Sequence, residues 1–124
     1  MNKELYIDIS NEEAGGSLYR VTGSKGETHF YYNHSSYNSD TDELQVFETN
    51  YPDFASFWQY VVSNPQWFYL HPLYIHPEQR AFIQAQLKGV NWSAGGNDIK
   101  WQQSHQRQWK KVLEAPDAYY KGPQ

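Results

Sequence analysis

The spacing of the hydrophobic residues changes once along this chain, and that change constrains the fold more than any other feature. Before residue 50 they alternate with polar residues, as in half-buried strands, and Leu5, Ile7 and Ile9 give the first example. After residue 53 they recur at intervals of three and four residues, which is the period of an amphipathic helix. Because the strands precede the helices instead of alternating with them, this order predicts an α+β fold.

Four segments of the first half have the residue types and the alternation of strands. Gly23–Gly26 is typical of a hairpin loop, and the polar stretch Asn33–Thr41 indicates a longer loop. Such short connections favour pairing between neighbours, so we predict a roughly four-stranded, mainly antiparallel sheet. The predicted strands are Glu4–Ile9, Ser17–Thr22, Glu27–Tyr32 and Glu43–Thr49.

Helical periodicity recurs in three segments of the second half, and we expect these helices to pack on one face of the sheet. Pro52 and Pro77 suit the first turn of the first two helices, and Asn97 can cap the third. Residues 66–76 include a segment that fits a short strand as well as a helical turn. The predicted helices span about 52–64, 77–89 and 97–114.

A length of 124 residues fits one domain that can bury a hydrophobic core, and the chain has no cysteine. We expect residues 1–124 to form a single domain with a loose C-terminal tail over about 116–124. No apolar run is long enough to cross a membrane, and the N-terminus lacks the apolar core of a signal peptide. These features predict a cytoplasmic protein without a membrane partner.

Charge and aromatic content both depart from the average. Aromatic residues make up 18% of the chain, so several of the eleven tyrosines and five tryptophans are expected at or near the surface. The net charge is −4, but residues 1–64 hold ten acids and three bases, whereas residues 65–124 hold four acids and seven bases. A nucleic-acid-binding domain usually shows a strong basic bias, so the acidic first half argues against a nucleic-acid partner.

A Tyr-(Leu/Ile)-His-Pro unit occurs twice and places His71 and His76 five residues apart. Imidazoles can ligate metals or act as an acid/base pair. An offset of five, however, points side chains to opposite faces of a strand, and on a helix it separates them by about 140°. We therefore interpret both histidines as structural, with His76 at the N-cap of the second helix, and we expect neither a metal nor another cofactor.

No catalytic motif accompanies the histidines. Ser35 and Ser36 lie in a polar segment without the glycine elbow of a hydrolase, and the glycines do not form a phosphate-binding pattern. We expect the chain not to be an enzyme.

Acids and aromatics are interleaved between residues 37 and 54. In protein interfaces aromatic side chains supply the desolvated anchors, while acids steer a basic partner and reject an acidic one. We predict that this stretch binds a basic protein. The predicted contact residues are Tyr37, Asp40, Asp42, Glu43, Phe47, Glu48 and Tyr51.

Small size, acidity, absence of cysteine and absence of a catalytic motif together resemble the character of immunity proteins that neutralise bacterial toxins. The resemblance implies an inhibitor of a basic toxin such as a nuclease. Three alternatives stay open: a small-ligand domain with an aromatic pocket around Trp58, Trp67 and Trp101, a metal-dependent or acid/base enzyme that uses His71 and His76, and an accessory subunit or homodimer without a ligand.

Overall fold

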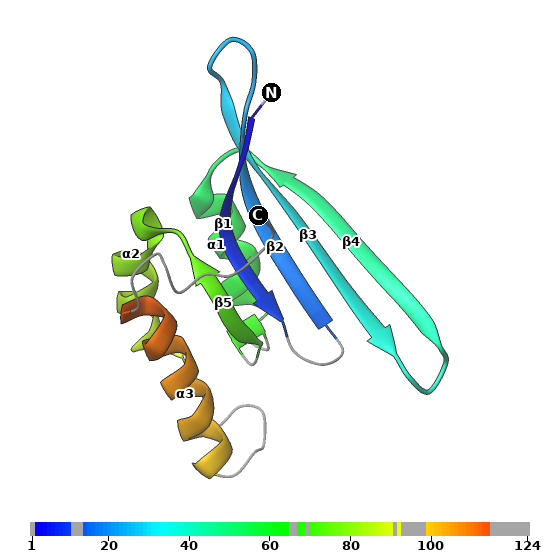
Figure 1. Ribbon diagram of the computed structural model, residues 1–124, viewed down its shortest axis with the longest axis vertical. Coiled ribbons are helices and arrows are strands. Elements are labelled where there is room, and N and C mark those ends of the chain that lie inside the picture. The colour runs from blue at the N-terminus through cyan, green and yellow to red at the C-terminus, as the bar shows by residue number, and fades with distance from the viewer. Residues whose placement is uncertain are drawn as a thin grey trace.

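The computed structural model describes residues 2–10, 14–64, 67–68, 70–90, 92 and 99–114, and it has the expected α+β arrangement (Figure 1). The strands are β1 (Asn2–Ser10), β2 (Ala14–Thr22), β3 (Thr28–Asn38), β4 (Glu43–Tyr51) and β5 (His71–Ile75). The helices are α1 (Phe54–Ser63), α2 (Pro77–Leu87) and α3 (Ile99–Glu114).

The strands form one antiparallel sheet in the order β4-β3-β2-β1-β5. The first four strands make the expected meander, but the sheet has five strands instead of four. β5 lies in the ambiguous interval 66–76, where five residues that include Pro72 are too few to show a strand period. It becomes a strand by pairing with β1 at the edge of the sheet, where a proline is tolerated.

The predicted loop Asn33–Thr41 is wrong in its first part, because β3 continues to Asn38. The polar residues from Asn33 onward pair with β4 in unbroken register up to Asn38 opposite Glu43. Strand pairing uses backbone N–H and C=O groups, so a polar segment can extend a hairpin when its partner strand continues beside it. In the turn that follows, Asp42 has a φ of 56°, which aspartate tolerates better than most residues.

Side-chain caps define where the first two helices begin. Asp53, not Pro52, precedes α1, and its carboxylate accepts a hydrogen bond of 2.8 Å from the Ser56 N–H. The predicted cap at His76 is confirmed: its Nδ1 accepts a hydrogen bond of 3.1 Å from the Glu78 N–H at the start of α2. The predicted cap at Asn97 and the predicted tail lie outside the described residues.

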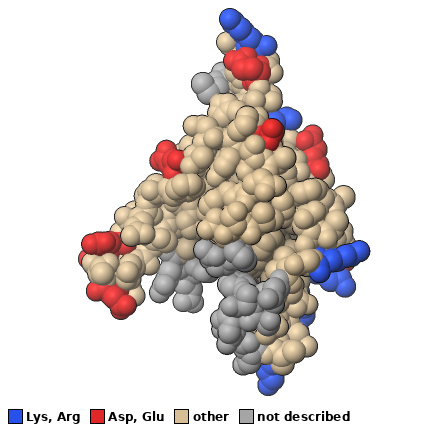
Figure 2. All heavy atoms as spheres, turned by 180° about the vertical axis from the view of Figure 1, so that it is seen from behind, with Lys and Arg blue, Asp and Glu red and all other residues tan. Residues whose placement is uncertain are grey.

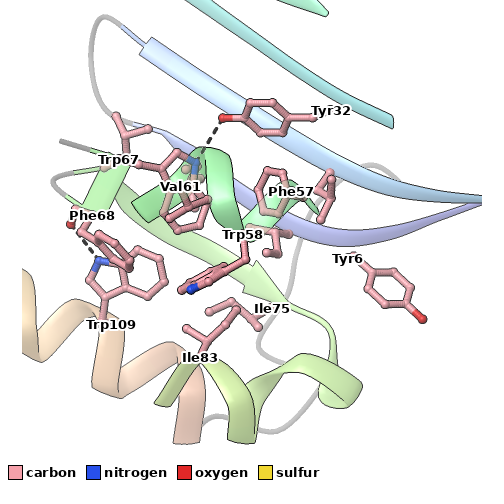
Figure 3. Packing of buried hydrophobic residues seen from close by; sticks show 14 of the residues in the cluster. Tyr6, Tyr32, Phe57, Trp58, Val61, Trp67, Phe68, Ile75, Ile83 and Trp109 are labelled. Carbon is pink, nitrogen blue, oxygen red and sulfur yellow. Dashed lines mark hydrogen bonds between the residues drawn. The ribbon is translucent and has the colours of Figure 1, made fainter. Parts of the chain in front are cut away.

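The core lies between one face of the sheet and the helices, and it is strongly aromatic (Figure 3). The Trp67 indole N–H donates to the Tyr32 hydroxyl at 3.1 Å, and the Trp109 indole N–H donates to the Phe68 carbonyl at 2.9 Å. A side chain at Gly16 would collide with the Tyr32 hydroxyl, so close packing here requires glycine. The core residues are Tyr6, Ile7, Ile9, Leu18, Phe30, Tyr32, Phe57, Trp58, Val61, Trp67, Phe68, Leu70, Ile75, Ile83, Trp109, Val112 and Leu113.

The helices do not cover the sheet evenly. Figure 1 shows α2 and α3 beside β5 and α1 behind the sheet, while the far part of the β3–β4 hairpin extends away from all three. Within the described ranges, no helix is long and apolar enough to cross a membrane. The uneven cover leaves the far part of the β3–β4 hairpin without helical packing.

Candidate functional site

β4 holds most of the predicted contact residues, and its alternation divides them between two faces. Phe47 stacks on Tyr60 of α1 with ring centroids 5.7 Å apart, and Tyr51 packs against Phe57 at the same distance. Both aromatic side chains therefore point toward α1. Because successive strand residues point to opposite faces, Glu48 lies on the other face of the sheet.

Phe47 and Tyr51 both contact α1, but they differ in how much of each side chain is exposed to solvent. Tyr51 is half-buried against Phe57 and Tyr60, and burial raises the pKa of its hydroxyl. Phe47 keeps a large exposed surface beside Tyr60. Of the two predicted anchors, Phe47 is the one that a partner can reach.

The face of the hairpin opposite α1 carries an exposed apolar patch. Tyr37 on β3 lies directly across from Leu44, and Ser35 lies across from Val46. The exposed fractions are 42% for Tyr37, 66% for Leu44 and 61% for Val46, which are large values for such side chains. We call Tyr37, Leu44, Val46 and Glu48 the β4 platform.

The platform adds two residues that the sequence analysis did not name as contacts, Leu44 and Val46. Their alternation with Gln45 already placed them on one side of a strand together with Glu48. The missing information was which side the helices cover, and the alternation of β4 alone does not contain it.

The acids at the tip of the hairpin are Asp40, Asp42 and Glu43, and all three are exposed. The Tyr37 hydroxyl donates a hydrogen bond to Asp42, and this bond, with a smaller effect of desolvation, raises the pKa of Tyr37. The Asp40 N–H donates to the Asn38 side chain at 3.0 Å. These local bonds hold the turn and leave its carboxylates facing solvent.

The hairpin acids have no basic residue nearby in sequence. No lysine or arginine occurs between Lys25 and Arg80, so β3, β4 and α1 contain none. Figure 2 shows carboxylates at a protruding corner of the molecule and most of the lysine and arginine side chains well away from it. Unmatched charge of one sign raises the local concentration of oppositely charged partners.

The Glu48 carboxylate interacts with Tyr31, which lies on the same face of the sheet. The Tyr31 hydroxyl donates a hydrogen bond to it, and desolvation together with this bond raises the pKa of Tyr31. Tyr31 in turn stacks beside Tyr19, and Lys3 lies over both rings at 5.1 and 5.3 Å from their centroids. The platform thus continues into an aromatic surface toward the centre of the sheet.

A second acidic region lies where α2 meets the sheet, and its carboxylates are matched. Arg20 binds Glu4 at 2.8 Å, and the Tyr6 hydroxyl donates to Glu78 at 2.5 Å. His76 uses Nδ1 as the helix cap, so its Nε2 carries the proton and donates to Glu4 at 2.9 Å. We call Glu4, Tyr6, Arg20, His76 and Glu78 the α2 clamp.

Two further groups of the clamp pack against the Tyr6 ring. The His76 ring lies parallel to it at 4.2 Å, and the Arg20 guanidinium lies 5.3 Å from its centroid. The hydrogen bond from Tyr6 lowers the pKa of Glu78, and burial raises the pKa of Tyr6. Each charged group has a partner, so the clamp fastens α2 to β1 and β2.

The structure places His71 and His76 in different surroundings. His71 stacks on His105 of α3 at 4.9 Å, and burial together with His105 lowers its pKa. His105 is buried, and its Nδ1 donates to the Trp101 carbonyl at 3.2 Å. In the part of the chain that the structure describes, no three or more histidine, aspartate or glutamate side chains gather as a metal would require.

The tryptophans proposed to line a ligand pocket take two different positions. Trp58 and Trp67 are 4% and 2% exposed and meet edge to face at 6.0 Å. Trp101 lies on α3, with its ring 4.0 Å from that of His105. Trp58 and Trp67 are part of the hydrophobic core, and Trp101 contacts His105 on its own helix.

Comparison with known proteins adds no relative. No family model matches the chain, and neither a search of curated proteins nor a search of solved structures finds a match. Function must therefore be inferred from the chain's own surface, and the β4 platform with the acidic tip is its strongest candidate site.

Proposed function

We propose that this chain is a non-catalytic binding protein that holds a basic protein partner against the β4 platform and the acidic tip of the hairpin. One observation carries the proposal: exposed apolar side chains lie beside acids that form no ion pair with a basic residue in the described part of the chain. Leu44 and Val46 form its apolar centre, and Asp40, Asp42 and Glu43 border it.

The two parts of this surface would act at different stages of binding. Exposed aliphatic and aromatic side chains gain free energy when a partner removes them from water, at about 25 cal/mol per Å². The acids act over a longer range, because they accelerate encounter with a positive surface and disfavour a negative one. A basic partner with an apolar contact patch would use both.

A small inhibitor of a basic toxin, such as a nuclease, is the biological role that suits this surface best. The clefts that nucleases use to bind phosphate backbones are positively charged, so an acidic hairpin can compete for them. The hairpin extends away from the helices (Figure 1), a shape that can reach into a cleft.

Two double variants with the same net charge test the proposal. Glu43→Lys/Glu48→Lys, the platform variant, changes one acid of the tip and one of the platform, whereas Glu27→Lys/Glu114→Lys changes exposed acids outside both. Each Glu→Lys adds two charges, so both double variants move the net charge from −4 to 0. Any difference between them comes from where the charge lies.

The measurement is affinity capture from the cells that produce the protein, at low and at high salt. We expect the native chain and Glu27→Lys/Glu114→Lys to retain the same basic protein at low salt and to lose most of it at high salt. The platform variant should not retain it. Equal capture by both double variants would show that the hairpin is not the binding surface.

A further inference from the structure

We infer that the partner binds by strand addition: an extended basic segment pairs with the free edge of β4. This inference rests on the proposed function and specifies its geometry. In the described ranges β4 pairs only with β3, so one side of its backbone is open along nine residues. Such an edge presents a row of N–H and C=O groups to a further strand.

The two edges of the sheet differ in how well they are protected. β5 has five residues, contains Pro72, pairs with β1 across a register shift and contacts α3. β4 is nine residues long, contains neither proline nor lysine, and pairs with β3 in continuous register from Tyr51 to Glu43. Proline, lysine, bulges and shortness are four of the features with which proteins prevent unwanted edge pairing. β4 lacks all four.

The side chains of β4 define what the added strand must carry. Leu44 and Val46 would lie about 5 Å from the cross-strand side chains of an added strand, which favours β-branched or aliphatic residues there. Glu43 and Glu48 lie at the two ends of this pair on opposite faces, and like charges opposite them would be destabilising. An extended segment that mixes lysine or arginine with β-branched residues fits these requirements.

The same charges disfavour a second copy of this chain as the occupant. Two β4 edges paired with each other would bring the acids of two hairpins together, and no lysine or arginine lies in either hairpin to offset them. The acids therefore favour pairing of this edge with a basic strand and disfavour pairing with the β4 strand of a second copy.

Three synthetic nonapeptides test this mode of binding. The first alternates lysine and threonine, the second has the same sequence with N-methyl groups on two adjacent central residues, and the third alternates glutamate and threonine. Adjacent N-methyl groups block both edges of the peptide but keep its charge. Binding is measured by NMR titration of the isotopically labelled protein, with amide hydrogen exchange of β4 as the structural readout.

We expect the lysine peptide to bind in a salt-sensitive manner and to slow the exchange of alternate β4 amides. N-methylation should weaken binding by about tenfold, because at least one backbone hydrogen bond is lost. The glutamate peptide should bind only the Glu43→Lys/Glu48→Lys variant. A change in the preferred peptide, from lysine for the native chain to glutamate for the variant, would show that the peptide binds along β4.

The outcomes separate this inference from the function on which it rests. If the N-methylated peptide binds as tightly as its parent and the glutamate peptide does not bind, the acidic surface stands and strand addition is overturned. A lysine peptide that leaves β4 exchange unchanged also overturns strand addition. If the native chain elutes as a dimer with protected β4 amides, a second copy occupies the edge and the inference is wrong.

Discussion

Two acidic regions of this molecule, the α2 clamp and the β3–β4 hairpin, use the same residue types for different purposes. In the clamp, Glu4 and Glu78 receive hydrogen bonds from Arg20, His76 and Tyr6. Along the hairpin, the carboxylates at the tip have no arginine or lysine within β3, β4 or α1. Paired carboxylates fasten two elements together, whereas unpaired ones leave their field to act on other molecules.

The two ends of the sheet also differ in how far their apolar side chains are buried. Near α1 and β5, one face of the sheet is buried beneath aromatic side chains, and Phe57 has no exposed surface. On β4, Leu44 and Val46 are mostly exposed although they are as apolar as core residues. The buried core therefore lies at the helix-covered end of the sheet, and the proposed binding surface lies at the β4 end.

The largest expected effect contrasts one apolar truncation at each end. Phe57→Ala should lower the free energy of unfolding by about 3–5 kcal/mol, because it removes a fully buried ring and leaves a cavity. Leu44→Ala should change it by no more than about 0.5 kcal/mol, because its side chain is already in water. Chemical denaturation followed by tryptophan fluorescence measures both, and similar losses in the two variants would abolish the contrast.

The next largest effect on stability is expected from removing the hydroxyl group of one tyrosine in each acidic region. Tyr6 and Tyr37 each donate a hydrogen bond to a carboxylate, but Tyr6 is buried in the clamp and Tyr37 is exposed on the platform. Tyr6→Phe should lower the free energy of unfolding by about 1 kcal/mol, a value reduced by the exposure of Glu78. Tyr37→Phe should leave the denaturation midpoint unchanged within error. A larger loss from Tyr37→Phe would mean that the tip is part of the stabilising framework.

How far the fold follows from the sequence depends on how much pattern each element carries. The strands up to β4 and the helix α1 have enough residues to show a period of two or of 3.6, and their order predicts the α+β class. β5 has five residues and a proline, so only its pairing with β1 makes it a strand. The polar end of β3 is a strand because β4 continues beside it, which is a property of the pair.

The two acidic regions were predictable to different degrees for a related reason. The hairpin acids are close in sequence, so their grouping is visible without a structure. The clamp joins Glu4, Arg20 and Glu78 from three separate segments, and only the folded sheet brings them together. The alternation of β4 puts Leu44 and Val46 on one side of the strand, but α1 decides which side stays exposed.

A smaller effect, on pH dependence, should come from two partly buried histidines, His34 on β3 and His71 on β5. Burial lowers the pKa of His34 and of His71 below the usual histidine value of 6.5. A lowered pKa means that the folded state favours the neutral imidazole. The resulting stabilisation is fully present above the unfolded-state pKa and is lost as the pH falls through the folded-state pKa. The free energy of unfolding should therefore decrease between about pH 7 and about pH 5.

Replacing these histidines checks the assignment. His71→Gln and His34→Gln should each make denaturation curves less sensitive to pH over that range, and the double variant should be flatter than either. The Glu43→Lys/Glu48→Lys variant provides the comparison from the hairpin and should retain the native slope. An unaltered slope in the double histidine variant would place the pH dependence elsewhere.

The smallest expected change in stability comes from giving β4 one of the protections that its edge lacks. Val46→Lys places a lysine in the middle of the platform, and Gln59→Lys adds the same charge on the exposed side of α1. Both should leave the free energy of unfolding within about 0.5 kcal/mol of the native value. Only Val46→Lys should weaken capture of the basic partner, because it replaces an apolar contact with a like charge at an edge. Val46→Lys could instead destabilise the fold while Gln59→Lys does not. Val46 would then contribute to the packing of the sheet, and the proposed division between a stabilising end and a binding end would be wrong at the centre of the platform.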